Sequence, residues 1–201
     1  TTEEFYTEKL VRLPRCFFCY RPTPDAPAVD ALPALAKGHV TFGSFNNFAK
    51  VTPEVLAAWA NILQAVPGAR IVILAAAVDS LREYLTRTLA QHGIGTDRFT
   101  LADRRPRGDY LRLIQQVDIA LDPFPFNGHT TTCDALWQGV PVVTLAGRTY
   151  AARFGSSAHV NLGLQELVAQ SPEQYVEIAS RLAGDMGFTD ARHYDIEAWI
   201  P

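Results

Sequence analysis

The amino-acid sequence predicts an α/β fold, in which a parallel, Rossmann-like sheet carries helices on both faces. Apolar runs typical of strands alternate about five times with segments of helical periodicity between residues 38 and 201. The run that follows Arg70, IVILAA, is apolar throughout, as a strand covered on both faces requires. Hydrophobic residues make up 48% of the 201 residues, which is enough to bury a core.

The first half of this region is predicted to hold three strands and two helices. Thr52 is a helix N-cap with Pro53 at the first helical position, and the helix stops before Pro67 and Gly68. The tetrapeptide Ser80-Leu81-Arg82-Glu83 matches a capping box that opens the second helix. The strands are predicted over residues 39–45, 70–76 and 98–102, and the helices over residues 53–66 and 80–92.

The second half is predicted to hold two further strands and several helices. Thr130, Thr131 and Thr132 suit the first turn of a helix better than its interior. Ser171-Pro172-Glu173-Gln174 matches another capping box. The strands are predicted over residues 117–121 and 141–145, and the helices over residues 107–116, 130–138, 149–158, 163–169 and 172–183, with a helical tail to Pro201.

Residues 1–37 are predicted to be an extended arm or linker, and residues 38–201 to be the Rossmann-like lobe. Five prolines interrupt any long element in the arm, namely Pro14, Pro22, Pro24, Pro27 and Pro33. The chain begins without an initiator Met, so we expect it to be a piece of a longer protein.

Composition disfavours several function classes. The formal net charge of −3 argues against nucleic-acid binding through bulk positive charge. No apolar run reaches the roughly 18 residues of a membrane span, and the start, Thr1 to Glu4, lacks the regions of a signal peptide. Cys16, Cys19 and Cys133 are too few for a disulfide framework or a zinc site. We therefore expect a cytoplasmic protein without a bound metal.

Several nucleotide-binding and hydrolase motifs are absent from the sequence. It contains no P-loop, no dinucleotide-binding fingerprint after a strand, no G-x-S-x-G and no D-x-D. A nucleotide-binding version of this fold would therefore neutralise phosphate by other means. Ligands of parallel sheets bind at the carboxyl ends of the strands. The predicted loops at that edge are residues 46–50, 77–79, 103–107, 122–129 and 146–150.

The densest polar cluster is Asn127-Gly128-His129-Thr130-Thr131-Thr132-Cys133-Asp134, where a helix is predicted to begin. A helix N-terminus presents backbone N–H groups and a positive dipole end to an anion. The carboxylate of Asp134 could accept hydrogen bonds from sugar hydroxyls. In the alternative interpretation, a residue such as Thr130 only caps a helix, and Asp134 is an ordinary acid of its first turn.

Basic residues lie in two other loops at the same predicted edge. Lys50 is one of only three lysines, and its ammonium could stabilise a nucleoside diphosphate leaving group without a metal. Tyr110 and the arginines Arg104, Arg105 and Arg107 follow the third strand, and one of these side chains could stack on a base. The alternatives are a solvated loop lysine and a solvated cluster of arginines.

Three strings resemble the C-terminal catalytic lobe of the O-GlcNAc transferase/SPINDLY family. They are GSFNNFAKVTP at residues 43–53, VDIALDPFPFNGHTT at residues 117–131 and DALWQGVPVVT at residues 134–144. The resemblance covers roughly residues 8–185. It implies the C-terminal lobe of a GT-B glycosyltransferase that is inverting and metal-independent and transfers a sugar to Ser or Thr hydroxyls. The implied sugar donor is UDP-GlcNAc, or GDP-fucose in an alternative O-fucosyltransferase.

The resemblance also implies roles for individual residues. Lys50 matches a lysine that contacts the diphosphate and supports leaving-group departure, and Asp134 matches an aspartate that holds ribose hydroxyls. In the family, the histidine and the two threonines that match His129, Thr130 and Thr131 contact phosphate or ribose. Animal members of the family differ from this sequence at three positions. They carry Gln where this sequence has Asn47, a lysine near the base where it has Arg107, and a base-stacking histidine where it has Tyr110.

The resemblance further implies partners outside this chain. A GT-B enzyme has a second, N-terminal lobe with candidate catalytic histidines, and tetratricopeptide repeats precede it in this family. We expect the isolated chain to bind nucleotide weakly and to transfer nothing, and we expect no nucleic-acid or membrane partner. Two rival interpretations are a non-catalytic nucleotide-binding or interaction module and a transferase that acts on small glycans or lipids.

Overall fold

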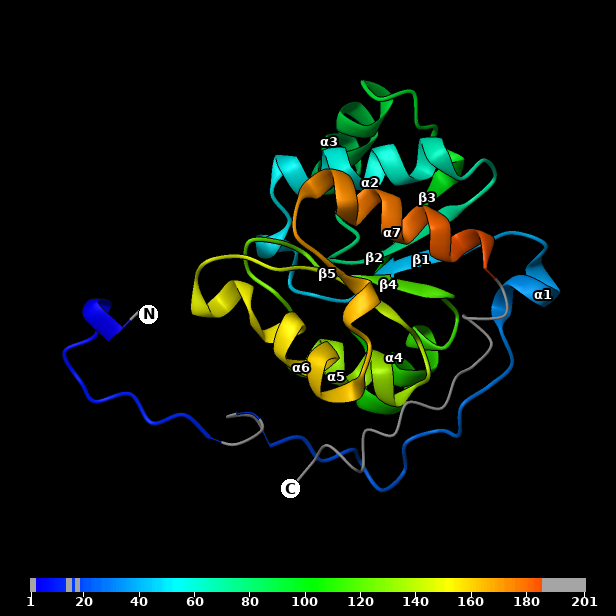
Figure 1. Ribbon diagram of the computed structural model, residues 1–201. Helices are drawn as coiled ribbons and strands as arrows, with labels where there is room; N and C mark the ends of the chain where they lie inside the picture. The colour runs from blue at the N-terminus through cyan, green and yellow to red at the C-terminus, as the bar shows by residue number, and fades with distance from the viewer. Residues whose placement is uncertain (1–2, 14–15, 17–18, 186–201) are drawn as a thin grey trace.

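A computed structural model of the protein describes residues 3–13, 16 and 19–185 (Figure 1). Its centre is a six-stranded sheet of order β3-β2-β1-β4-β5-β6, in which all neighbouring strands are parallel. From β1 the chain adds β2 and β3 on one side, and it then crosses back to add β4, β5 and β6 on the other side of β1. The switch point of the sheet therefore lies between β1 and β4. The strands are β1 (Thr41–Ser44), β2 (Arg70–Leu74), β3 (Phe99–Ala102), β4 (Ile119–Leu121), β5 (Val142–Leu145) and β6 (Val168–Ala169).

Helices cover both faces of the sheet. Figure 1 shows α2, α3 and α7 on one face and α4, α5 and α6 on the other. The α-helices are α1 (Pro33–Lys37), α2 (Pro53–Ala65), α3 (Asp79–Ala90), α4 (Arg107–Ile114), α5 (Thr130–Trp137), α6 (Phe154–Leu162) and α7 (Pro172–Gly184). Short 3₁₀ helices are η1 (Glu3–Phe5), η2 (Phe48–Lys50), η3 (Thr96–Arg98), η4 (Tyr150–Ala152) and η5 (Gln165–Leu167). The predicted α/β sheet with helices on both faces is confirmed.

Two helix starts follow from their capping residues. The Thr52 hydroxyl accepts a hydrogen bond from the N–H of Val55 at 3.3 Å, and Pro53 occupies the first turn of α2. The Ser171 hydroxyl accepts from the N–H of Gln174 at 3.2 Å at the start of α7. Each hydroxyl satisfies a backbone donor that the helix itself cannot pair.

The core lies on both sides of the sheet, under α2 and α7 and under α4, α5 and α6. Phe42, Ile71 and Ile119 of three adjacent strands are buried, and so is Trp59 of α2. Burial on both faces explains why the strand sequences are apolar runs rather than alternating ones.

Three predicted elements differ from the structure. Instead of one helix over 149–158, the chain forms the 3₁₀ helix η4 and then α6, which runs on to Leu162. The helix predicted over 163–169 is wrong: Gly163 ends α6 with φ of 72°, and residues 168–169 form the edge strand β6 against β5. The capping box predicted at Ser80 is also wrong, because α3 begins at Asp79 after Val78, without a side-chain cap. The helical tail predicted to residue 201 lies outside the described residues beyond 185.

The arm is more closely attached to the lobe than an extended linker would be. It contains the short helix α1, and its residues Tyr20 and Leu32 are buried. The N–H of Ala34 donates to Asp118 Oδ1 at 2.8 Å, which ties α1 to the amino end of β4. None of the helices in the described ranges is both long and apolar enough to span a bilayer.

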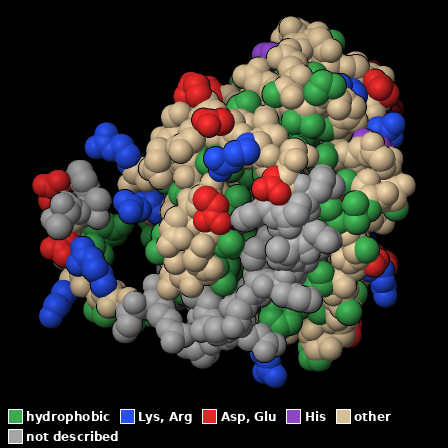
Figure 2. Space-filling view, turned by 45° about the vertical axis from the view of Figure 1, so that its right-hand side comes forward, with side chains coloured by type: hydrophobic (Ala, Val, Ile, Leu, Met, Phe, Trp, Pro, Cys, Tyr) green, Lys and Arg blue, Asp and Glu red, His purple; other side chains and the backbone are tan. Residues whose placement is uncertain are grey.

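On the face of the molecule that Figure 2 shows, basic and acidic side chains are interspersed.

Candidate functional site

A cleft of about 650 Å³ opens at the carboxyl edge of the sheet, beside the switch point between β1 and β4. This volume lies within the range of small-molecule sites, about 300–1,000 Å³. The cleft is lined by residues at and after the carboxyl ends of β1, β2 and β3 and by residues of α3, α4 and α5. They are Phe45, Asn46, Asn47, Phe48, Leu74, Ala75, Ala76, Leu81, Arg104, Arg105, Arg107, Tyr110, Thr130, Thr131 and Asp134.

Lys50, at the end of η2, lies beside this cleft and is half-buried. Its ammonium donates to the carbonyl of Asn127 at 2.9 Å and to Asn46 Oδ1 at 3.3 Å. It also lies 4.2 Å from the centroid of the Phe126 ring, a favourable position for a cation. Burial lowers the pKa of Lys50, and the charge of Asp122 opposes that shift. Two of the three ammonium hydrogens are engaged in these contacts, which leaves one to donate to a ligand.

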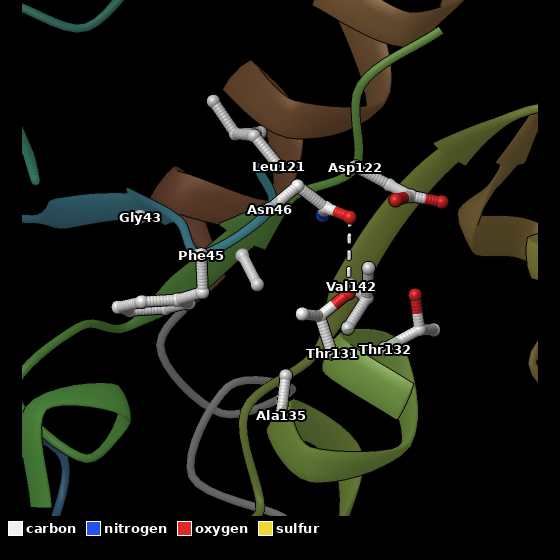
Figure 3. A pocket seen from close by; sticks show the side chains of 10 residues that line it. Gly43, Phe45, Asn46, Leu121, Asp122, Thr131, Thr132, Ala135 and Val142 are labelled. Carbon is white, nitrogen blue, oxygen red and sulfur yellow. Dashed lines mark hydrogen bonds between the residues drawn. The ribbon is translucent and has the colours of Figure 1, made fainter. Parts of the chain in front are cut away.

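Asn46 connects Lys50 with the start of α5. Its Oδ1 accepts from the Thr131 hydroxyl at 3.0 Å as well as from Lys50. Figure 3 shows Asn46 and Thr131 pointing toward one another across a small cavity, with Asp122 at the end of β4. The amide of Asn46 is itself buried, so the polar contacts hold it in place.

The N-terminus of α5 faces the same edge of the sheet. Thr130 is exposed at the cleft, and the helix dipole places partial positive charge there. Gly128 precedes this turn in a position with no room for a side chain. A Cβ atom there would lie 2.7 Å from Thr132 Oγ1 and 3.0 Å from Asn46 Oδ1, and it would overlap Thr131 Oγ1.

Asp122 directly follows β4 and is buried beneath this loop. The N–H of Gly128 donates to Asp122 Oδ1 at 2.6 Å, and the Thr144 hydroxyl donates to Oδ2 at 2.8 Å. Burial raises the pKa of Asp122 to about 7, while these two hydrogen bonds, the charge of Lys50 and a hydrogen bond from the Asn46 side chain act in the opposite direction.

Asp134, the fifth residue of α5, is buried in a network with Arg107 and Tyr20. Arg107 donates two hydrogen bonds to it, Nη1 to Oδ2 at 2.6 Å and Nη2 to Oδ1 at 2.5 Å. The Tyr20 hydroxyl donates to Oδ1 at 2.7 Å. The ion pair raises the pKa of Arg107, and burial, followed by the Asp134 charge, raises that of Tyr20. Asp134 therefore fixes the guanidinium of Arg107 at the wall of the cleft.

The structure places Arg107, rather than Tyr110, at the surface of the cleft. Tyr110 is only 9% exposed, and its ring packs edge-on against Phe45 at 6.2 Å between centroids. The Arg107 guanidinium carbon lies 5.5 Å from the centroid of the Tyr110 ring. A planar ligand entering the cleft would therefore meet the guanidinium before the phenol ring.

His129 lies at the N-cap of α5 among aromatic rings. Its ring centroid is 4.5 Å from that of Phe154 and 6.4 Å from that of Tyr150. Burial lowers the pKa of His129, and the nearby Lys50 charge lowers it further, so the ring is neutral near pH 7.

The sequence-predicted site residues come together at one edge of the sheet. Six of them line the cleft, and Lys50 and His129 lie beside it. The six are Asn47, Arg107, Tyr110, Thr130, Thr131 and Asp134. The Asn47 side chain is exposed and caps η2 by accepting from the N–H of Ala49 at 3.1 Å.

Three residues of this network, Asn46, Asp122 and Tyr20, are not among the site residues predicted from the sequence. Asn46 and Asp122 lie in predicted strand-end loops, so their position was the available signal. Nothing in the sequence indicates that Tyr20, which is 114 residues away from Asp134, reaches it. Cys16, Cys19 and Cys133 form no disulfide with one another. Across the described residues, no three His, Cys, Asp or Glu side chains are grouped to hold a metal ion.

The fold and the cleft are those of a Rossmann-like lobe of a GT-B glycosyltransferase. The sequence matches Glycosyl transferase family 41 over residues 30–198. The chain belongs to this family, an O-GlcNAc-type glycosyltransferase family, as the sequence motifs implied.

Named relatives agree with this assignment. The chain is 45% identical over 188 residues to the probable UDP-N-acetylglucosamine–peptide N-acetylglucosaminyltransferase SPINDLY of Arabidopsis thaliana, covering 92% of this chain and 21% of that protein. It is 32% identical to the probable transferase SEC of the same plant, covering 89% of this chain and 19% of that protein. The chain thus spans about a fifth of the length of these relatives.

Solved structures give the same result. A structure of a Thermobaculum terrenum O-GlcNAc transferase mutant superposes with a TM-score of 0.90 at 39% identity, covering 98% of this chain and 38% of that one. Staphylococcus aureus TarM shares the fold, with a TM-score of 0.64 at 10% identity over 90% of this chain and 36% of that one.

Proposed function

We propose that this chain is the lobe of a protein O-glycosyltransferase that binds the sugar donor, UDP-GlcNAc, for transfer of GlcNAc to Ser or Thr hydroxyls. The observation that carries the proposal is the arrangement around Lys50. Its ammonium is held by Asn46 and Asn127 beside the N-terminus of α5, so two positive groups meet at one cleft edge. This arrangement suits the two phosphates of a nucleoside diphosphate.

In this proposal, Lys50 and the N-terminus of α5 stabilise the negative charge that develops on the departing UDP. Preorganised positive groups of this kind act on the transition state and need no metal ion. We accordingly propose a metal-independent reaction, with inversion of configuration at the sugar carbon attacked by the hydroxyl. Thr130, Thr131 and His129 would complete the contacts to phosphate and ribose.

Arg107 and Asp134 would hold the nucleoside. Asp134 lines the cleft and already accepts hydrogen bonds from Arg107 and Tyr20, and in this proposal it also accepts one from a ribose hydroxyl. The planar guanidinium of Arg107, which is partly exposed at the cleft, would stack on the base. Asn47 and Tyr110 would shape the cleft around the base and ribose.

The acceptor protein would bind outside this chain's cleft, with a second lobe and tetratricopeptide repeats of the complete enzyme. The names of the SPINDLY relatives support the UDP-GlcNAc donor and a peptide acceptor, and the name of the bacterial structure supports O-GlcNAc transfer.

Transfer by the complete enzyme tests the proposal. Mass spectrometry of acceptor proteins should detect added N-acetylhexosamine with UDP-GlcNAc as the sugar donor, and Lys50→Ala should lower the rate by about 100-fold. Lys37→Ala is the matched control, because Lys37 also donates to a backbone carbonyl, that of Gln116 at 2.7 Å, at the opposite edge of the sheet. No transfer by the wild-type enzyme, or full transfer by Lys50→Ala, would contradict the proposal.

A further inference from the structure

We propose that Asp122 is a positioning residue for Lys50 and that it acts through the peptide unit between Asn127 and Gly128. The proposal rests on the proposed function of Lys50 as the group that binds the diphosphate. Asp122 itself is buried beneath the loop, so it would act on the ligand only through Lys50.

One peptide unit separates the carboxylate of Asp122 from the ammonium of Lys50. Its N–H, from Gly128, donates to Asp122 Oδ1 at 2.6 Å. Its carbonyl, from Asn127, accepts from Lys50 Nζ at 2.9 Å. The N–H and C=O of a trans peptide point in opposite directions, so the two charged groups hold this peptide from opposite sides. Lys50 and Asp122 themselves do not form a direct ion pair.

The carboxylate that anchors this arrangement is fixed by two further elements. Thr144 of β5 donates its hydroxyl hydrogen to Asp122 Oδ2 at 2.8 Å. Gly155 of α6 closes the site, because a Cβ atom there would lie 3.0 Å from Asp122 Oδ2 and would overlap Thr144. Asp122 is 1% exposed, and a hydrogen bond from the side chain of Asn46, which itself accepts from Lys50, also favours its charged form. The carbonyl of Asn127 is thereby aimed at Lys50 by β4, β5 and α6 together.

The charge of Asp122, like its hydrogen bonds, strengthens the interaction between the Asn127 carbonyl and the Lys50 ammonium. In a site away from water, hydrogen-bonded groups polarise one another, so a carboxylate on the N–H makes the carbonyl a stronger acceptor for the ammonium. The other titratable groups facing this pair are His129, beside Lys50, and Tyr175 of α7, whose hydroxyl donates to the backbone carbonyl of Asp122 at 3.0 Å. Burial keeps both neutral, since it lowers the pKa of His129 and raises that of Tyr175.

The experiment is a pH titration of the lysine side chains of this chain by NMR, in wild type, Asp122→Asn and Asp118→Asn. The chain has three lysines, so the signals of Lys9 and Lys37 serve as internal references. We expect Asp122→Asn to lower the measured pKa of Lys50 by about one. Asp118→Asn should leave it unchanged, although Asp118 has the same 1% exposure and accepts backbone N–H groups at the other end of β4.

UDP and uridine binding to the same variants provides the second measurement. Asp122→Asn should weaken UDP binding by about tenfold and leave uridine binding unchanged, because only the diphosphate contacts Lys50. Adding Asp122→Asn to Lys50→Met should cause no further loss, since residues that act through one another are not additive. If Asp122→Asn does not fold, Thr144→Val replaces it, with a smaller shift in the same direction.

The outcomes separate this inference from the proposed function. An unchanged Lys50 titration in Asp122→Asn, or an equal change in Asp118→Asn, overturns the positioning role even where UDP binds. A shifted Lys50 titration in a chain that binds no UDP supports the positioning role and overturns the proposed function.

Discussion

The two edges of the sheet hold the same pair of residue types in different surroundings. At the amino edge, Lys37 donates to the carbonyl of Gln116, and Asp118 accepts the backbone N–H groups of Ala34 and Thr41. At the carboxyl edge, Lys50 and Asp122 likewise bond to backbone groups. The difference is that Lys37 is exposed, whereas Lys50 is half-buried and is bridged to Asp122 by one peptide unit.

We expect this difference to decide whether a substitution at each edge affects the stability of the fold or the binding of a ligand. The amino edge uses its charged groups to tie α1 and β1 to β4, and every bond there joins one part of the fold to another. The carboxyl edge holds a half-buried ammonium with one donor left over, beside a cleft and a helix N-terminus. Changes at the amino edge should therefore affect unfolding, and changes at the carboxyl edge should affect ligand binding.

The largest effect is expected from Lys50→Met. Removing a charged donor that binds the diphosphate should weaken UDP binding by up to about 3 kcal/mol. Lys37→Met should leave UDP binding unchanged, because Lys37 lies at the other edge of the sheet. Calorimetric titration of both variants measures this difference, and equal losses would remove the distinction between the edges.

Gly128→Ala should disrupt the carboxyl edge by steric overlap. The added methyl group would overlap the hydroxyls of Thr131 and Thr132, so we expect a loss of about 2 kcal/mol in unfolding free energy together with weakened UDP binding. Gly184→Ala is the control, since a Cβ at the end of α7 meets nothing within 4 Å. Urea denaturation of the two variants gives the comparison, and a fully stable Gly128→Ala variant would contradict the described packing.

Conversion into asparagine should destabilise the protein more at Asp118 than at Asp122. Both oxygens of Asp118 accept backbone N–H groups, so an amide NH₂ there would face a donor, at a cost of about 1.5 kcal/mol. In Asp122→Asn the NH₂ would face the Thr144 hydroxyl, which can turn to accept it, and the cost should be smaller. Urea midpoints measure stability, and lower stability in Asp122→Asn than in Asp118→Asn would reverse the comparison.

Asp122 should also give the protein a distinctive pH dependence. Its pKa is raised from 3.8 to about 7 in the folded chain, so between these values the folded state holds a proton that the unfolded state releases. Its contribution to stability is therefore present below about pH 4 and is lost as the pH rises through about 7. Urea denaturation from pH 4 to 8 should show this slope in wild type and Asp118→Asn but not in Asp122→Asn. An unchanged slope in Asp122→Asn would assign it to other groups.

The smallest effect is expected from Tyr20→Phe, in the arm. The variant loses one hydrogen bond to Asp134 and keeps the buried ring, so unfolding free energy should fall by about 1 kcal/mol. Arg107 still holds Asp134 by two hydrogen bonds, so UDP affinity should change far less than in Lys50→Met. A large loss of UDP affinity in Tyr20→Phe would extend the binding site into the arm.

The sequence predicts the parallel sheet well because buried strands leave a strong signal. Apolar runs bounded by Pro, Gly and capping residues identify β1 to β5. In contrast, β6 consists of only two residues, which is too short to show a pattern of apolar residues. Gly163 marks the end of α6, but the segment after it has enough apolar residues to suggest another helix. Short edge strands depend on pairing with a neighbour, which local sequence does not encode.

The candidate site is predictable only in part. The loops follow from the rule that ligands bind at strand carboxyl ends, and the sequence motifs select Lys50 and Asp134 within them. The contacts between these residues are set by tertiary packing. Asp134 meets Arg107 and Tyr20 across distant parts of the chain, and Lys50 is connected to Asp122 through the peptide before Gly128 and through the side chain of Asn46.

The most direct test of the central claim is to follow the Lys50 side-chain NMR signal of this chain during titration with UDP and, separately, with GDP. If Lys50 binds the diphosphate, its signal should change saturably with UDP, while the signals of Lys9 and Lys37 stay constant. A change with GDP alone would contradict the assignment of a uridine nucleotide. No saturable change at Lys50 with either nucleotide would contradict a diphosphate site at this edge of the sheet.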